Sequence, residues 1–219
     1  MVHAPKVVDD VPAAFVTLLE EQRPRSVALS GGSTAHNCYE ACAVAQADWS
    51  DTTFWFGDER WVSVDDPDSN EGMARRVWLD RVPVGGIVSM VNAGSDPESA
   101  AASYGARLQA AGGIDVVHLG LGPDGHTASL FPGSPSTAET ARWVIATGDE
   151  AHPHPRLTLT FVALAAARQI VVTAVGAEKR QAVAGVLAGN PDLPAGRLVV
   201  DPLLAAKTVW LLDADAARS

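Results

Sequence analysis

The sequence lacks the features of a nucleic-acid-binding, membrane-spanning or disulfide-stabilised protein. Its 16 lysines and arginines are outnumbered by 26 aspartates and glutamates, for a net charge of −10, whereas general nucleic-acid binding needs a basic surface. No signal peptide and no apolar run of membrane-spanning length is present, so we expect a cytoplasmic protein with no membrane partner. Cys38 and Cys42 are the only cysteines, and their spacing in a helical segment indicates small buried residues rather than a disulfide or a metal site.

Common functional motifs are also missing. The chain has no G-x-S-x-G nucleophile elbow, no H-E-x-x-H zinc site and no P-loop lysine,. The segment Gly120-Leu-Gly-Pro-Asp-Gly125 does satisfy the dinucleotide fingerprint G-x-G-x-x-G. However, Asp124 would place a negative charge where a pyrophosphate must approach backbone N–H groups, and Pro123 removes one of those donors. We therefore do not expect dinucleotide binding here.

Apolar segments along the 219 residues alternate between strand-like and helix-like patterns. This alternation predicts an α/β protein with a doubly wound, mostly parallel sheet and helices on both faces, and the length fits one domain over 1–219. The expected strands are 26–29, 52–56, 87–91, 114–121, 143–146, 157–160, 170–175 and 208–212. The expected helices are 11–21, 35–47, 71–79, 97–111 and 161–167, with another beginning at 176.

The segment 115–133 is the strongest candidate for a catalytic site. It begins as a buried strand and then turns at Gly120, Gly122, Pro123 and Gly125,. Asp124 and His126 lie two residues apart in that turn. Because open α/β sheets carry their chemistry on loops at the carboxyl ends of strands, this acid and this imidazole are predicted to face a cleft. The alternative is that His126 is a hydrogen-bonded structural residue.

A second glycine-rich turn is typical of a phosphate site. Ser30, Gly31, Gly32, Ser33 and Thr34 connect the expected strand 26–29 to the expected helix 35–47. Glycines allow backbone N–H groups to approach an anion, hydroxyls add donors, and a helix N-terminus favours negative charge. Capping of the helix by Ser33 or Thr34 is the simpler interpretation, and it is compatible with phosphate binding.

Cations follow other predicted strands. We expect Arg60 at the carboxyl end of the strand 52–56, Arg156 at the start of the strand 157–160, and Lys179 in the first turn of a helix. A guanidinium can bind phosphate through two parallel hydrogen bonds, and a lysine in a first turn suits an anion placed there. Of Asp58 and Glu59, we expect one to orient Arg60 and the other to be solvated.

These motifs together resemble the 6-phosphogluconolactonase family. The segments that carry the resemblance occur in family order: Ser30-Gly-Gly-Ser33, Asp58-Glu-Arg60 with Ser69-Asn70, Asp124-Gly-His126-Thr-Ala-Ser-Leu-Phe-Pro132, Arg156-Leu-Thr158 and Gly176-Ala-Glu-Lys179. The resemblance implies a fold related to glucosamine-6-phosphate isomerases. It also implies hydrolysis of 6-phosphogluconolactone in the pentose phosphate pathway, without a required cofactor or metal. The expected partner is a small sugar phosphate, and the expected state is a monomer or a weak homodimer.

The chemistry of a lactone agrees with these residues. His126 would take a proton from an attacking water, Asp124 would orient His126 or stabilise its charged form, and loop N–H groups or a cation would hold the oxyanion. The turn 30–34 with Arg60, Arg156 and Lys179 would hold the 6-phosphate. A glucosamine-6-phosphate isomerase/deaminase is the nearest alternative, but that family carries a glutamate five residues after the histidine, where this chain has Phe131. A non-catalytic sugar-phosphate sensor is the other.

Overall fold

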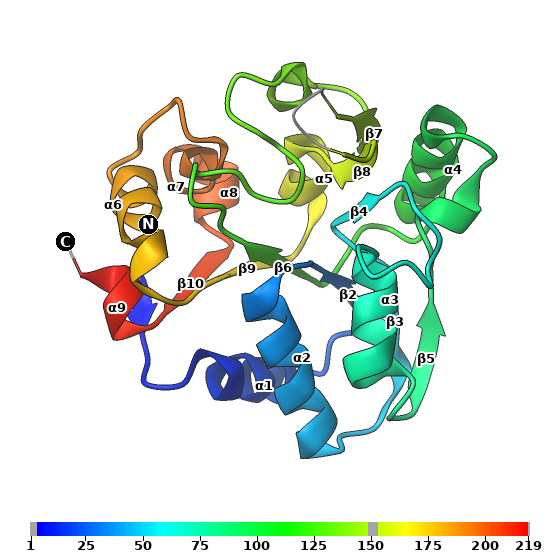
Figure 1. Cartoon of the computed structure of the whole chain (residues 1–219), viewed down its shortest axis with the longest axis horizontal. Coiled ribbons are helices and arrows are strands. Elements are labelled where there is room, and N and C mark those ends of the chain that lie inside the picture. The colour runs from blue at the N-terminus through cyan, green and yellow to red at the C-terminus, as the bar shows by residue number, and fades with distance from the viewer. Residues whose placement is uncertain (1–3, 149–152, 219) are drawn as a thin grey trace.

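The computed structural model describes residues 4–148 and 153–218 (Figure 1). Its centre is a parallel sheet of seven strands in the order β1-β10-β9-β6-β2-β3-β5. The strands are β1 (Lys6–Val7), β2 (Ser26–Leu29), β3 (Trp49–Phe56), β5 (Val84–Ile87), β6 (Val116–Gly120), β9 (Gln169–Ala174) and β10 (Thr208–Leu212). The predicted doubly wound α/β fold is therefore confirmed.

Helices cover both faces of this sheet. One face carries α1 (Val11–Gln22), α2 (Ser33–Ala45) and α3 (Asn70–Ala74). The opposite face carries α4 (Pro97–Ala110), α5 (Phe161–Ala166), α6 (Arg180–Leu187), α7 (Arg197–Val200) and α8 (Pro202–Ala205) (Figure 1). The short α9 (Ala214–Ala217) follows the last strand. No helix within the described ranges is both long enough and apolar enough to span a membrane.

The strand order reverses at the parallel neighbours β2 and β6, so that successive strands are added to the sheet in opposite directions from this point. From β2 the connections lead to β3 and β5, whereas from β6 they lead the other way, to β9 and β10. A crevice opens at such a point, outside the carboxyl ends of the strands, and ligands of α/β sheets bind there. Ser30 follows β2 directly and Gly120 ends β6, so both glycine-rich turns reach this crevice.

Burial follows the expected helical and strand periods. In α1, Val11, Phe15 and Leu19 are buried at intervals of four residues, which is the spacing of one helix face. Asp10 caps that helix by accepting a hydrogen bond from the N–H of Ala13 at 2.9 Å. The predicted burial of Cys38 and Cys42 is confirmed, and both thiols are free.

A second, antiparallel sheet was not predicted. It has the strand order β4-β8-β7, formed by β4 (Asp58–Arg60), β8 (Arg156–Leu159) and β7 (Val144–Thr147). The expected strands 143–146 and 157–160 exist within one residue of their predicted bounds, but they pair in this small sheet rather than in the parallel one. Arg60 therefore does not lie at the carboxyl end of β3, because Asp58–Arg60 is a strand of its own.

One predicted strand was wrong in position, and one predicted helix lies where expected but is partly π-helical. The strand expected at 87–91 is β5, Val84–Ile87, and a 3₁₀ turn occupies Val91–Ala93. The strand was not predicted at this position because glycine is depleted in strands. Glycine is required at Gly85, because a Cβ there would lie 2.5 Å from the carbonyl oxygen of Ser50 on β3. The helix expected at 71–79 is α3 continued by a π-helical turn, Arg75–Leu79.

Candidate active site

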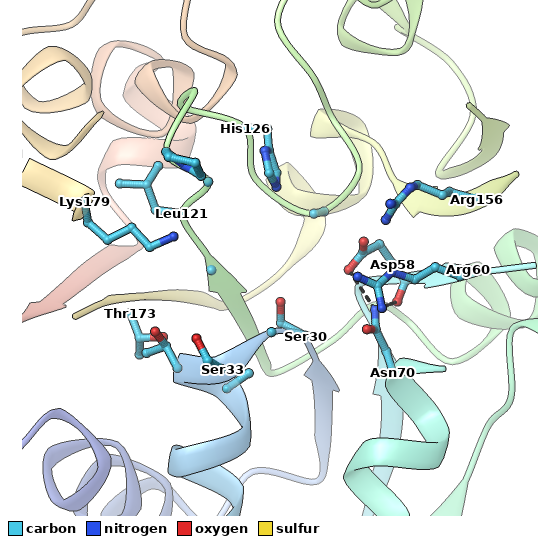
Figure 2. Close-up of a pocket in the computed structure, with 18 residues that line it drawn as sticks. Ser30, Ser33, Asp58, Arg60, Asn70, Leu121, His126, Arg156, Thr173 and Lys179 are labelled. Atoms are coloured by element: carbon cyan, nitrogen blue, oxygen red, sulfur yellow. Dashed lines mark hydrogen bonds between the residues drawn. The ribbon is translucent and has the colours of Figure 1, made fainter. Parts of the chain in front are cut away.

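A cavity of about 220 Å³ opens at the crevice between β2 and β6 (Figure 2), and its size suits a small ligand rather than a drug-sized one. It brings together nine of the ten predicted site residues, whereas Asp124 does not line it. The residues in contact with the cavity are Ser30, Gly31, Gly32, Ser33, Thr34, Ala35, Asp58, Arg60, Asn70, Gly120, Leu121, Gly122, Pro123, His126, Ala128, Arg156, Thr173 and Lys179.

The turn after β2 presents an uncapped helix N-terminus to the cavity. The N-cap of α2 is Gly32, whose φ of 90° lies in the region that favours glycine, and no side chain caps the helix,. The alternative interpretation, capping by Ser33 or Thr34, is therefore wrong, since these residues are the first two of the helix itself. The hydroxyls and the first N–H groups of α2 remain available to an anion, which the helix dipole attracts.

The small sheet places two arginines opposite each other. Arg60 on β4 pairs directly with Arg156 on β8 in the antiparallel register, and both side chains reach the cavity. Like charges in directly opposed positions destabilise a strand pair. An anionic ligand between them would reverse the sign of that interaction. One nitrogen of the Arg60 guanidinium donates to the carbonyl oxygen of Asp68 at 2.6 Å.

Lys179 approaches the cavity from the other side (Figure 2). It is the last residue of the 3₁₀ turn Ala177–Lys179 and the N-cap of α6, so it lies one residue before the first helical turn in which it was predicted. In Figure 2 its side chain extends toward Thr173 and Ser33, whereas Arg60 and Arg156 lie at the opposite end. The cavity thus has cations at both ends in a chain whose net charge is −10.

The expectation that one carboxylate of this pair is solvated was wrong, because Asp58 and Glu59 are both buried. Glu59, 1% exposed, accepts hydrogen bonds from the backbone N–H groups of Arg60, Asn70 and Glu71 and from the Ser69 hydroxyl. Burial raises the pKa of Glu59 to about 7, against the lowering effect of those N–H groups. Glu59 thus fastens the start of α3 to β4.

Asp58 is the buried carboxylate that lines the cavity. One of its oxygens accepts a hydrogen bond from the Ser129 hydroxyl at 2.7 Å, and the other accepts from the side-chain amide of Asn70 at 3.4 Å. Ser129 lies three residues after His126, and its N–H donates to the Thr158 hydroxyl on β8 at 3.1 Å. Asp58 therefore ties the histidine loop to the small sheet.

His126 and Asp124 form a hydrogen-bonded pair in a tight loop. The imidazole Nδ1 lies 2.6 Å from Oδ1 of Asp124, and the same oxygen accepts the backbone N–H of His126 at 3.1 Å. The N–H of Gly122 donates to the His126 carbonyl at 2.9 Å, and Gly125 turns the chain with a φ of 82°. Because Nδ1 is engaged by the carboxylate, Nε2 is the ring nitrogen left for chemistry. Figure 2 shows the ring pointing into the cavity.

Charge and packing define the surroundings of this pair. Burial raises the pKa of Asp124, but the hydrogen bonds and the charge of His126 outweigh it, so that the net shift is downward. The carboxylate is therefore ionised at neutral pH. The imidazole ring lies 4.7 Å, centroid to centroid, from the ring of Phe131, over which the guanidinium of Arg156 lies at 5.5 Å.

The loop does not have the structure of a dinucleotide site. A Rossmann fingerprint leads directly into a helix whose N-terminus receives the pyrophosphate. Here residues 121–134 form turns and a single bridge between Thr127 and Leu130.

Asp58, Asn70 and Thr173 line the cavity but were not predicted as site residues. Asn70 and Asp58 belong to segments singled out by the family resemblance, which is the signal that could have found them. Thr173 lies within the apolar strand β9, and no local pattern marks it.

Comparisons with known proteins identify the family and the fold of the chain. Residues 2–210 match the family model described as glucosamine-6-phosphate isomerases/6-phosphogluconolactonase. The chain is 40% identical to a 6-phosphogluconolactonase of Nostoc sp. over 91% of this chain and 86% of that protein. Its fold matches the 6-phosphogluconolactonase of Trypanosoma brucei with a TM-score of 0.76 and 30% identity over 98% of each chain. A monomeric glucosamine-6-phosphate deaminase has the same fold, with a TM-score of 0.81 at 19% identity over 98% of this chain and 99% of that one.

Proposed function

The chain belongs to the family of glucosamine-6-phosphate isomerases and 6-phosphogluconolactonases, and from this membership and the site we propose that it hydrolyses 6-phospho-D-glucono-1,5-lactone to 6-phosphogluconate. The reaction is the lactonase step of the oxidative pentose phosphate pathway. The observation that carries the proposal is the His126–Asp124 pair at 2.6 Å, directed into a cavity with cations at both ends.

We propose His126 as the general base and then the general acid. Nε2 takes a proton from water as the water oxygen attacks the lactone carbonyl carbon, and a tetrahedral oxyanion forms. When the bond between that carbon and the ring oxygen breaks, the imidazolium returns the proton to the departing ring oxygen. Such proton transfer contributes on the order of 10²–10⁴-fold. The ionised Asp124 holds the ring by Nδ1 and stabilises its charged form.

Binding of the phosphate group orients the substrate in the cavity. The 6-phosphate would be contacted by the cations at one end of the cavity, drawn from Arg60, Arg156 and Lys179, and by the turn residues Ser30, Gly31, Gly32, Ser33 and Thr34. Since these cations lie at two ends of the cavity, one end can hold the phosphate while the other faces the developing oxyanion. Binding energy at the remote phosphate then positions the carbonyl against His126.

Phe131 argues against deamination of glucosamine 6-phosphate. It stands five residues after His126, where the deaminases carry a glutamate, and its ring packs directly against the imidazole. A carboxylate that could shuttle protons for ring opening is thus replaced by an apolar ring at that place.

Comparing two reactions tests the proposed function. We expect the protein to accelerate acid release from 6-phosphogluconolactone well above the spontaneous rate and to release no ammonia from glucosamine 6-phosphate. Ammonia release without lactone hydrolysis would identify a deaminase. Tight binding of 6-phosphogluconate without either reaction would identify a sugar-phosphate sensor.

Assays on substrates with and without phosphate show which cations bind the phosphate and which stabilise the oxyanion. The substitutions Lys179→Ala, Arg60→Ala and Arg156→Ala are each assayed on 6-phosphogluconolactone and on gluconolactone. A cation that holds the phosphate loses its effect on KM with the unphosphorylated lactone, whereas a cation that stabilises the oxyanion lowers kcat with both. If no cation distinguishes the two lactones, the proposed phosphate site is wrong.

A further inference from the structure

A buried polar network lies directly beneath the cavity. Its members are Tyr39 on α2, His118 on β6 and Thr173 on β9, all at most 1% exposed. His118 Nδ1 lies 2.9 Å from the Tyr39 hydroxyl, and Nε2 lies 2.9 Å from the hydroxyl of Thr173. We call these residues the His118 network.

Both ends of the His118 network are at the site. The Tyr39 hydroxyl accepts the backbone N–H of Ser30 at 2.7 Å and lies 3.2 Å from the Ser30 carbonyl oxygen. Ser30 and Thr173 line the cavity, whereas His118 does not. In the register of the sheet Thr173 pairs with Gly120 and His118 pairs with Val171, so Thr173 lies between His118 and the cavity.

A histidine is a costly choice for this position. Its ring packs 4.3 Å from that of Phe15, centroid to centroid, where an apolar side chain would need no polar partners. Burial lowers the pKa of His118 to about 3, so the imidazole is neutral and carries one N–H. A neutral imidazole donates at one nitrogen and accepts at the other, which links the hydroxyls of Tyr39 and Thr173.

Two arrangements of the hydrogens satisfy this geometry. In the first, Nδ1–H donates to Tyr39, Tyr39 donates to the Ser30 carbonyl, and the Thr173 hydroxyl donates to Nε2. In the second, Tyr39 donates to Nδ1 and Nε2–H donates to Thr173, which leaves the Thr173 hydrogen free for the cavity. An anion above Thr173 needs a donor and therefore favours the second arrangement.

We propose that His118 is a positioning residue of this site, which fixes the backbone of Ser30 through Tyr39 and turns the Thr173 hydroxyl toward the phosphate of the bound sugar. The role rests on the proposed function, and it adds Thr173 to the groups that contact substrate. His118 and Tyr39 touch no reacting atom, so they act on substrate binding rather than on the chemical step.

Tyr104 provides a matched control. Its hydroxyl accepts the N–H of Phe56 at 2.7 Å and lies 3.2 Å from the Phe56 carbonyl oxygen, the same contacts that Tyr39 makes with Ser30. Both tyrosines are fully buried, but Phe56 does not line the cavity. Tyr39→Phe and Tyr104→Phe therefore remove equivalent hydrogen bonds to the backbone, one at the site and one away from it, and Tyr39→Phe also removes the bond to His118.

The test compares the KM and kcat of the two variants, with the Kd for 6-phosphogluconate. For Tyr39→Phe we expect KM and Kd to rise about tenfold, because a buried N–H loses its acceptor at the site, with kcat within about twofold of wild type. For Tyr104→Phe we expect wild-type KM, kcat and Kd. Equal effects of the two substitutions on KM and Kd, whether nil or large, would overturn the role of Tyr39.

Thr173→Val tests the other end of the network with a side chain of the same shape. We expect a similar rise in KM for 6-phosphogluconolactone and no rise for gluconolactone. In the complex with 6-phosphogluconate, ¹⁵N NMR should place the ring proton of His118 on Nε2; a proton on Nδ1, or a wild-type KM for Thr173→Val, would overturn this half. A wild-type protein that hydrolyses no lactone would instead overturn the proposed function.

Discussion

Gly122→Ala is expected to disable the catalytic pair while leaving the fold intact. A Cβ at Gly122 would lie 2.1 Å from Nδ1 of His126 and 2.6 Å from Oδ1 of Asp124, distances that no real contact allows. The φ of Gly122 is not among the positive values, so alanine fits the backbone there. The nearest conflicts are with these two side chains, which must move away from the added methyl group.

The structure sets the size of the effect. The His126 and Asp124 side chains are 31% and 49% exposed, so they can swing outward, and the cost in stability should stay below the roughly 1–3 kcal/mol of overpacking in a closed core. Displacing a catalytic group by about 1 Å can cost about 10² in rate. We therefore expect kcat to fall about 100-fold while KM changes little, since the phosphate contacts remain.

The assay is pH-stat titration of the acid released from 6-phosphogluconolactone, corrected for spontaneous hydrolysis, with thermal unfolding measured alongside. Gly86→Ala is the control, because Gly86 lies on β5 and a Cβ placed there would meet no neighbouring atom within 4 Å. A wild-type kcat for Gly122→Ala would refute the claim that catalysis needs the paired geometry. An equal loss in Gly86→Ala would show a general effect of added side chains.

Three further predictions each concern one residue: Gly31, Asp10 and His118. A Cβ at Gly31 would lie 1.9 Å from Oδ1 of Asn70, so Gly31→Ala should disturb the phosphate turn and raise KM more than it lowers kcat in the same titration. Asp10→Ala removes the cap of α1 and should lower the free energy of unfolding by about 0.5–2 kcal/mol in urea, with unchanged kcat. Because the pKa of His118 is lowered to about 3, the unfolded state binds more protons between about pH 3 and 6.5; stability should fall with decreasing pH there by up to about 1.4 kcal/mol per pH unit. This contribution should be missing from the stability curve of His118→Gln, so the difference between the wild-type and variant curves should carry the slope,. Parallel curves for the two proteins would contradict the lowered pKa.

The glycine-rich turns and the parallel sheet could be predicted because their signals are local. Short apolar runs that end in Gly31-Gly32 or in Gly120 and Gly122 indicate strands that finish in sharp turns. The alternation of such runs with helices sets the sheet type, and the sheet type sets where the turns meet. The predicted site residues of the two turns, Ser30 to Thr34 and His126, therefore line one cavity.

The small sheet and the buried carboxylates could not be predicted in this way. The strand Asp58–Arg60 consists wholly of charged residues, and a local pattern assigns such residues to a solvated loop. Glu59 can be buried because its carboxylate accepts hydrogen bonds from the backbone N–H groups of residues 70 and 71. His118 reaches Ser30 only through Tyr39, which is 79 residues away from it in sequence. These contacts depend on the tertiary fold, so no window of sequence contains them.

The turnover of His126→Ala, set beside its affinity for 6-phosphogluconate, tests the central claim most directly. If the imidazole moves the proton of the attacking water, kcat for 6-phosphogluconolactone falls by about 10²–10⁴-fold, while the Kd stays near the wild-type value because the phosphate contacts are untouched. A variant that keeps wild-type turnover would remove His126 from the reaction and contradict the account.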